Sequence, residues 1–145
     1  GLITAPYAYR LPTDVEWSLA VGLQNEQGST PAERDGRIKG VYAWGTAWPP
    51  SIGAGNFADN VSCDRFEKTS PVASFLPNRQ GLYDLAGNAW EWCEDWSDSS
   101  QKTRVLRGGS WFGYIPGSLF SSYRRHLASN ERRNDHGFRC VLASE

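Results

Sequence analysis

The sequence predicts a small α+β domain with little regular secondary structure, held together by large aromatic rings. Of the 145 residues, 13% are aromatic, and seven of them are Trp. The chain also has 15 glycines and eight prolines, which mark turns or interrupt regular elements. A chain of this length fits one domain with a single core, and we assign residues 1–145 to one domain.

One helix is predicted by a capping box at Thr13-Asp-Val-Glu16, in which a hydroxyl at the N-cap is followed by Glu three residues later. Val15, Leu19 and Ala20 fall on one face of that helix. Gly22 then supplies a stop. We therefore expect a short helix that ends before residue 22.

The remaining elements are less regular. Residues 24–40 are polar and predict an exposed excursion, whereas Val41–Gly45 predicts a brief strand. Residues 48–55 include two prolines and two glycines, which exclude a helix or a central strand. Arg104–Arg107 predicts a strand, and the glycine pair after it marks a turn or a close approach of the backbone. Residues 137–142 predict a closing buried strand.

Two segments are rich in side-chain oxygens. Residues 81–96 combine three Trp, four carboxylates and two glycines without the period of a helix or a strand, so we predict a loop. Calcium takes six to eight oxygen ligands, often a mixture of carboxylates and carbonyls. Acidic surface loops explain the same residues, and both interpretations stay open. The oxygen-bearing residues are Asp84, Asn88 and Glu91 in this segment, and Asn56, Asp59, Asn60 and Asp64 in residues 56–66.

Charge and cysteine content limit the function classes. The net charge is −1 without long runs of one sign, so nothing favours nucleic acid as a partner. No apolar run approaches the roughly 18 residues of a membrane span, and no secretory signal is present. Cys63, Cys93 and Cys140 lack the spacing of a metal site, which favours free thiols in a reducing compartment and slightly favours the cytoplasm. The absence of Met indicates a piece of a longer protein.

Four motifs occur in a fixed order: Arg10-Leu-Pro-Thr-Asp-Val-Glu-Trp17, Gly81-Leu-Tyr-Asp-Leu-Ala-Gly-Asn-Ala-Trp-Glu-Trp92, Arg107-Gly-Gly-Ser-Trp111 and Gly137-Phe-Arg139. Together they resemble the formylglycine-generating enzyme family, also called sulfatase-modifying factors. The resemblance implies a variant of the C-type lectin fold, of which this chain is the C-terminal two-thirds. We expect the missing N-terminal portion to leave an apolar face that the rest of the domain or another chain covers.

The resemblance implies two calcium sites with mixed side-chain and carbonyl ligands. The first set is Asp84, the carbonyls of Gly87 and Ala89, and Glu91. The second set is Asn56, the carbonyl of Phe57, Asp64 and the carbonyl of Phe66.

The catalytic chemistry of the family requires two cysteines after the Gly-Gly-Ser-aromatic segment, which bind copper(I) and activate oxygen to oxidise a substrate cysteine. Soft thiolates suit copper(I). Here the two positions are Gly113 and Ser118, so we expect no copper and no oxidase activity. Cys140 resembles a family cysteine that often forms a disulfide, but the partner position here is Val21.

Other enzymatic interpretations are also weak. Related sulfoxide synthases hold iron with histidines of a separate domain, whereas this chain has only His126 and His136, which we predict to be solvated surface residues. Ser110 is expected to cap a strand, because the spacing supports no Ser-His-Asp triad. Arg107 and Arg139 are predicted to be buried or half-buried partners of carboxylates at Glu91, Glu94 or Asp95.

The segment after the glycine pair has the composition of a recognition surface. The stretch from Arg104 to Arg139 is similar in layout to the variable region of target-binding proteins made by diversity-generating retroelements. About half of the large apolar and basic residues of 112–126 should be core, with Leu119 and Phe120 as candidates and Arg124 left open. The predicted ligand-binding residues are Trp111, Phe112, Tyr114, Ile115, Tyr123, Arg125 and His126.

Three functions remain open. The first is a non-catalytic module that binds a protein or small-molecule ligand, either as a diversified binding protein or as an accessory domain of a bacterial signalling protein. The second is an enzyme of the same superfamily whose catalytic groups lie outside this chain. The third is a structural element whose calcium sites stabilise an interface.

Overall fold

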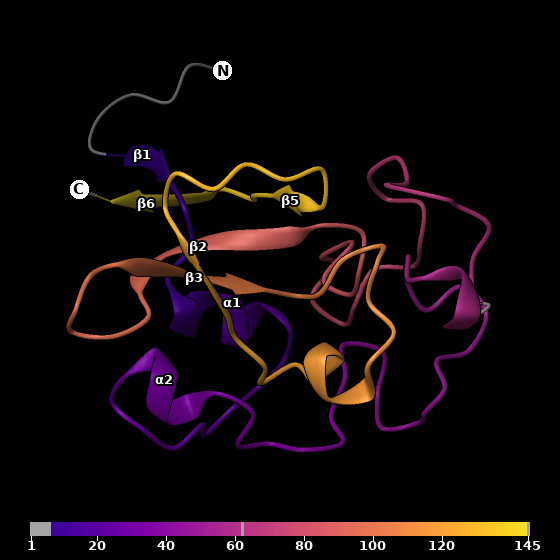
Figure 1. Ribbon diagram of the computed structural model, residues 1–145, viewed down its shortest axis with the longest axis horizontal. Helices are drawn as coiled ribbons and strands as arrows, with labels where there is room; N and C mark the ends of the chain where they lie inside the picture. Colours follow the sequence, from indigo (N-terminus) through magenta and orange to yellow (C-terminus); the bar gives the residue numbers. More distant parts are fainter. Residues whose placement is uncertain (1–6, 62, 145) are drawn as a thin grey trace.

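Two small sheets and a few short helices hold an otherwise irregular chain in the computed structural model, which describes residues 7–61 and 63–144 (Figure 1). The larger sheet has the strand order β4-β3-β2-β5, and a separate pair joins β1 to β6. The strands are β1 (Tyr7–Arg10), β2 (Trp90–Trp96), β3 (Thr103–Arg107), β4 (Arg125–Ala128), β5 (His136–Gly137) and β6 (Val141–Ser144). The helices are α1 (Asp14–Ala20) and α2 (Pro31–Arg34), with 3-10 turns η1 (Asp59–Val61) and η2 (Pro116–Leu119).

The strand β2 lies at the centre of the larger sheet, so the prediction of a loop over residues 81–96 was wrong for its second half. Trp90 and Cys93 are buried, and Glu91 is also buried because its carboxylate is paired. The ladder with β3 is interrupted between Trp92 and Trp96 by a register shift. A strand that buries a carboxylate and contains an irregularity does not show a two-residue period.

The predicted helix is present as α1, and its capping box is confirmed. Thr13 Oγ1 accepts a hydrogen bond from the amide of Glu16, and the Glu16 carboxylate accepts one from the amide of Thr13. Val15 and Leu19 share a face, but that face is exposed. The buried side of α1 packs against β2 and β3 and carries Asp14, Trp17 and Ser18.

Asp14 is buried because it lies among three arginines. Its carboxylate pairs with Arg107 and with Arg124, both of which are fully buried, and with Arg34 at 2.7 Å. Arg124 also pairs with Glu26 at 2.8 Å. The prediction that Arg107 pairs with a carboxylate at residue 91, 94 or 95 was therefore wrong, because its partner comes from α1.

Of two local predictions in the first half of the chain, the exposure of residues 24–40 is confirmed and the strand at residues 41–45 was wrong. Residues 24–40 are mainly exposed but contain the helix α2, which a second capping box, Thr30 with Glu33, initiates. Residues 41–45 form a tight turn closed by hydrogen bonds between Tyr42 and Gly45 rather than a strand. Residues 48–55 are irregular, as predicted.

The core consists of two clusters of large rings and small side chains. One contains Trp17, Leu85, Cys93 and Val105 between α1 and the sheet. The other lies under the irregular segment. Its members are Tyr42, Phe57, Cys63, Ala86 and Leu119.

The C-terminal segment differs from the single buried strand that the sequence predicts. Its first part, β5, pairs in parallel with β2, whereas β6 pairs with β1 and is partly exposed. Phe138, between them, is exposed. The predicted strand at Arg104–Arg107 is confirmed as β3.

The domain predicted over residues 1–145 includes residues 1–6, 62 and 145, which lie outside the described residues. No helix within residues 7–61 and 63–144 has the length and apolarity that crossing a membrane requires.

Candidate functional site

The segment that follows β3 is held in place by its glycine pair. Gly108 and Gly109 both adopt positive φ, at 93° and 82°, which glycine tolerates without steric cost. A Cβ at Gly109 would lie 2.6 Å from Leu119 Cδ2, so the backbone approaches the core closely. The amide of Trp111 then donates to the carbonyl of Asn88 at 3.0 Å. The chain therefore leaves the sheet at a fixed point before the predicted recognition residues.

Three of the predicted ligand-binding residues line one cleft of about 320 Å³, which we call the aromatic cleft. Trp111 meets Phe112 edge-on, with ring centroids 5.6 Å apart, and Phe112 meets Tyr114 in the same way at 6.4 Å. Phe112 and Tyr114 are 63% and 47% exposed. Large rings with this much open surface are available to a partner.

The opposite wall of the aromatic cleft comes from the second oxygen-rich segment. A hydrogen bond of 3.1 Å from the amide of Ala58 to the carbonyl of Gly113 joins the two walls. Asp59, Asn60 and Glu67 also line the cleft, and no basic side chain does. Sequence reasoning identified Asp59 and Asn60 as oxygen-bearing residues but gave no signal that they face the rings.

The other predicted ligand-binding residues do not line the aromatic cleft. Ile115 is exposed at the start of η2. Tyr123 packs on Trp90, with ring centroids 5.9 Å apart, and Arg125 lies 5.5 Å over the same indole. His126 belongs to β4 and pairs with β3.

Two further residues of this segment belong to the core. Leu119 is buried, as predicted, because it packs beneath the glycine pair. Arg124 is buried in the charge cluster with Asp14 and Glu26, so it stabilises the fold and is not available to a ligand.

The two positions that would hold copper-binding cysteines have other structural roles. A Cβ at Gly113 would lie 2.8 Å from Leu119 Cδ2 and 3.0 Å from the Ser110 carbonyl oxygen. The hydroxyl of Ser118 donates to the carbonyl of Ile115 at 2.9 Å. A side chain at residue 113 therefore requires its neighbours to move.

In the described part of the chain, the first predicted calcium set contains one carboxylate oxygen without a hydrogen-bond partner, at Asp84, and one carboxylate that is already paired, at Glu91. Asp84 Oδ2 accepts from the amide of Ala73, whereas Oδ1 is buried and has no hydrogen-bond partner in the part of the chain that the structure describes. Both oxygens of Glu91 accept from Arg139 at 2.6 Å, and Oε2 also accepts from Trp17 Nε1. The predicted pairing of Arg139 with a carboxylate is thus confirmed. A calcium ion bound by Glu91 would share that carboxylate with Arg139 and Trp17.

Among the described residues, the second predicted set also has one side-chain oxygen without a hydrogen-bond partner, at Asn56. Asn56 donates through Nδ2 to the Lys68 carbonyl at 2.8 Å, and its Oδ1 is buried without a hydrogen-bond partner among residues 7–61 and 63–144. Asp64 accepts from the amides of Phe57 and Phe66, both at 2.8 Å, so the four predicted residues lie on one closed loop. A buried oxygen without a donor is the feature that a cation would satisfy.

Clusters made only of metal-binding side chains are a different kind of site. Across the described ranges, no group of three or more His, Cys, Asp or Glu side chains is placed to hold a metal. The two predicted calcium sets depend mainly on carbonyl and amide oxygens.

The side chain of His136 is buried, contrary to the prediction of a solvated histidine. Its side chain is 3% exposed, it meets Trp92 edge-on, and burial lowers its pKa below the ordinary value. Asp135 lies between this ring and Ser110, 3.4 Å from Nε2 and 3.3 Å from the Ser110 hydroxyl. A nucleophilic triad instead places the histidine between the serine and the aspartate.

The three cysteines are free thiols, as predicted. Cys63 and Cys93 are buried, whereas Cys140 is exposed. Burial and the neighbouring Asp64 raise the pKa of Cys63 to about 11. Burial also raises the pKa of Cys93. Neither buried thiol has the lowered pKa of a reactive cysteine.

Comparison with known proteins agrees with this geometry. The sequence model of the family described as "Sulfatase-modifying factor enzyme 1-like domain" matches residues 3–144. The mouse protein "Inactive C-alpha-formylglycine-generating enzyme 2" is 35% identical over 148 residues, which cover 93% of this chain and 43% of the relative. The formylglycine-generating enzyme of Streptomyces coelicolor is 32% identical over 158 residues, covering 91% of this chain and 46% of the enzyme.

Among solved structures, Treponema denticola variable protein 1 superposes with a TM-score of 0.61 at 29% identity, covering 94% of this chain and 48% of that protein. The predicted α+β fold of C-type lectin-like type is thereby confirmed. The chain spans less than half the length of these relatives.

Proposed function

The chain belongs to the sulfatase-modifying factor enzyme 1-like domain family, and on that premise we propose that it is a non-catalytic module that binds a protein or small-molecule ligand at the aromatic cleft. The observation that carries this proposal is the exposure of Phe112 and Tyr114 beside Trp111, on a segment that the glycine pair fixes to the sheet. Rigidly held, exposed rings bind partners at a low cost in conformational entropy.

The chemistry of the cleft favours certain ligands. Rings attract planar and apolar groups, and they attract cations through their faces. Asp59 and Glu67 add negative charge to the same walls. A ligand with a planar or positively charged group, such as an arginine side chain of a protein, fits both properties.

Two further observations support a binding role over catalysis. The copper-binding positions are Gly113 and Ser118, and a Cβ at Gly113 would require Leu119 and the Ser110 carbonyl to move. One relative is named as an inactive formylglycine-generating enzyme, and one structural neighbour is named as a variable protein. We infer that this chain shares the loss of copper chemistry and uses its post-sheet segment for recognition.

We also propose that calcium binds both oxygen-rich segments. Asp84, Glu91 and the carbonyls of Gly87 and Ala89 would hold one ion. Asn56, Asp64 and the carbonyls of Phe57 and Phe66 would hold the other. The support is the open Oδ1 of Asp84 and of Asn56, one in each set. The ions would stabilise irregular backbone that borders the aromatic cleft.

A peptide selection tests the binding role. A displayed random-peptide library is selected on the chain, and enriched peptides are titrated against the chain, the double variant Phe112→Ala/Tyr114→Ala and the control Val72→Ala. Val72 is an exposed apolar residue that does not line the aromatic cleft. We expect at least about tenfold weaker binding to the double variant, since loss of anchor rings costs upward of about 1–2 kcal/mol. Equal affinity for all three proteins would contradict the assignment of the cleft.

A turnover assay tests the absence of catalysis. The chain is incubated with copper(I), oxygen and a cysteine-containing peptide, and the peptide is followed by mass spectrometry. We expect an unchanged peptide mass, with the Streptomyces coelicolor relative as positive control. Oxidation of the cysteine by this chain would refute the non-catalytic role.

A further inference from the structure

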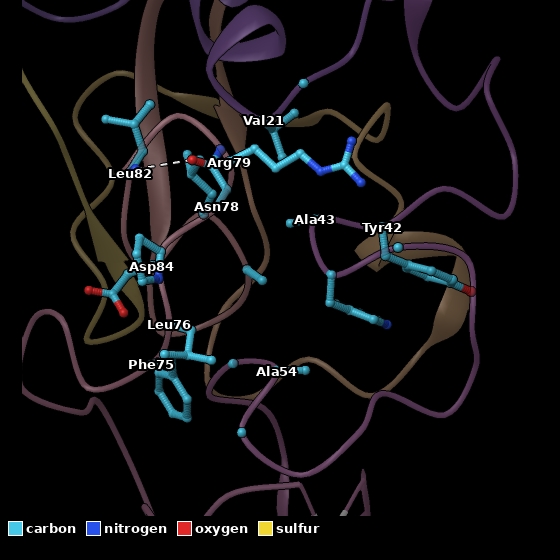
Figure 2. Close-up of a pocket in the computed structure, with 18 of the residues that line it drawn as sticks. Val21, Tyr42, Ala43, Ala54, Phe75, Leu76, Asn78, Arg79, Leu82 and Asp84 are labelled. Atoms are coloured by element: carbon cyan, nitrogen blue, oxygen red, sulfur yellow. Dashed lines mark hydrogen bonds between the residues drawn. The ribbon is translucent and has the colours of Figure 1, made fainter.

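A second cavity, separate from the aromatic cleft, lies between the turn after α1 and residues 75–86 (Figure 2). Its volume of about 760 Å³ falls within the range of small-molecule sites. None of its lining residues belongs to the aromatic cleft or to η1, so it is separate from the ligand site proposed above, although Asp84 of the first proposed calcium set lies in its lining.

Aromatic and aliphatic side chains line part of this cavity, beside polar and charged ones. Tyr42 and Trp44 stack with ring centroids 4.6 Å apart and an interplanar angle of 8°. Trp44 is also fixed by a hydrogen bond from Nε1 to the Ala47 carbonyl, 2.9 Å long. Val21 and Leu82 contribute aliphatic surface. A pair of positioned rings with aliphatic neighbours suits the flat body of an organic molecule.

One charged side chain, that of Arg79, extends into the cavity beside these rings (Figure 2). Among the lining residues only Arg79 and Asp84 carry a formal charge at neutral pH. Figure 2 shows Arg79 extended across the cavity, whereas the Asp84 carboxylate points away from it. The Asp84 carboxylate is instead engaged by the amide of Ala73 at 2.7 Å. Within residues 7–61 and 63–144, the Arg79 guanidinium has no hydrogen-bond or ion-pair partner.

The turn that carries Arg79 is held rigidly. Asn78 donates through Nδ2 to the carbonyl of Ala20 at the end of α1, at 2.7 Å. Its Oδ1 accepts from the amides of Gln80 and Leu82, at 2.9 and 3.0 Å. The backbone of Arg79 is therefore anchored on both sides, while its side chain carries five N–H donors that have no acceptor among the described residues.

From these observations we propose that the cavity binds a small organic anion with a planar apolar body. The guanidinium of Arg79 holds the carboxylate, sulfonate or phosphate group, and the rings of Tyr42 and Trp44 contact the body. Arginine matches such anions because its planar fork donates two parallel hydrogen bonds. No other cation lines the cavity, so the affinity for the anion depends on this one residue.

Paired probes test the proposal by two-dimensional ¹H–¹⁵N NMR. 2-Naphthoate and its uncharged analogue 2-naphthamide are titrated into the chain, with the amide signals of Gly22, Gly45 and Gly53 as reporters in the cavity lining. We expect saturable shifts of these signals with naphthoate, and binding of naphthamide at least about tenfold weaker, which is the effect of losing a charge-assisted hydrogen bond.

Variants distinguish this site from general attraction of anions. Arg79→Gln should weaken naphthoate binding at least about tenfold, and Arg79→Lys should restore part of it. Arg132→Gln is the matched control, since Arg132 is exposed, lines none of the described cavities and is also without a partner in the described part of the chain. Unchanged naphthoate affinity in Arg79→Gln, equal binding of naphthamide, or shifts confined to the aromatic cleft would each overturn the proposal.

Discussion

The buried carboxylate of Asp14 gives the sharpest test of how this fold is held together. Asp14 is 0% exposed and pairs with Arg107, Arg124 and Arg34. The substitution Asp14→Asn keeps the size of the side chain but removes its charge. Arg124 retains Glu26, and Arg34 is bound to two backbone carbonyls.

The cost of this substitution falls mainly on Arg107. Its side chain is 0% exposed, and its remaining hydrogen-bond acceptors are the Ser18 hydroxyl and the backbone carbonyls of Ser121 and residue 14, which carry no charge. Removing one member of a buried ion pair costs about 3–5 kcal/mol, because the other charge stays desolvated. That is a large part of the roughly 5–15 kcal/mol that stabilises a typical domain.

Urea unfolding followed by tryptophan fluorescence measures this loss. With a slope of about 2 kcal/mol per molar urea, the midpoint should fall by roughly 1.5–2.5 M in Asp14→Asn. The matched control is Glu131→Gln, because Glu131 pairs with Arg133 on the surface, where such pairs contribute about 0–1 kcal/mol. A change of less than about 1 kcal/mol in Asp14→Asn would refute the conclusion that this cluster is a main support of the fold.

The carboxylate of Asp14 also predicts how the free energy of unfolding changes at low pH. Burial raises the pKa of Asp14, but the charge of Arg107 and the hydrogen bonds from Arg124 outweigh it, so the pKa lies below the ordinary value. A lowered pKa in the folded state means that the stabilisation is complete above the unfolded value near 3.8 and is lost as pH falls through the folded value. The free-energy difference between the wild type and Asp14→Asn should therefore shrink below about pH 4, and a constant difference would contradict this assignment.

Three further predictions concern thiols, cations and backbone geometry. A thiol reagent at pH 8 should modify Cys140 rapidly and leave Cys63 unreacted until urea is added, because Cys63 is buried and its pKa is raised to about 11; reaction of all three thiols in the native protein would contradict this. Calcium should raise the melting temperature relative to chelator, by a free energy of about 2.7 kcal/mol at a hundredfold excess over Kd, and no shift together with no bound metal would exclude both sites. Gly87→Ala should cost at least about 2 kcal/mol by urea unfolding, since Gly87 has φ of 70° and a Cβ there would lie 2.0 Å from the Asn56 carbonyl oxygen; Gly36→Ala, with φ of 61° and no atom within 4 Å of the added Cβ, isolates the backbone cost, and equal losses would show that the close contact relaxes.

The local signals in the sequence predicted several elements correctly. The capping box at Thr13–Glu16 depends on side chains three residues apart, and the helix α1 begins where that box predicts. The strand β3 and the turn at Gly108 and Gly109 follow in the same way from the local sequence, in which Val105 and Leu106 precede a glycine pair. The four ordered motifs identified the family, because each motif is a short run of residues whose types and spacing can be read from the sequence alone.

The predictions that failed share a physical cause. Patterns of hydrophobicity assume that apolar residues face inward, but α1 buries Asp14 and exposes Val15 and Leu19. β2 likewise buries Glu91, because Arg139 neutralises it from a segment 48 residues away. A buried charge is tolerated only when its partner arrives from elsewhere in the fold, so its position cannot be predicted from its own segment.

The same distinction applies to function. By itself the sequence determined the family, the short capped helix and the absence of cysteines at Gly113 and Ser118, since residue identities and local spacing are sufficient for each. Only the tertiary structure decided that Trp111, Phe112 and Tyr114 share a cleft while Arg124 and His136 are buried. It also placed Arg79 beside an aromatic wall, with no partner for its charge in residues 7–61 and 63–144. Such groupings depend on contacts between distant segments, and these contacts exist only once the chain has folded.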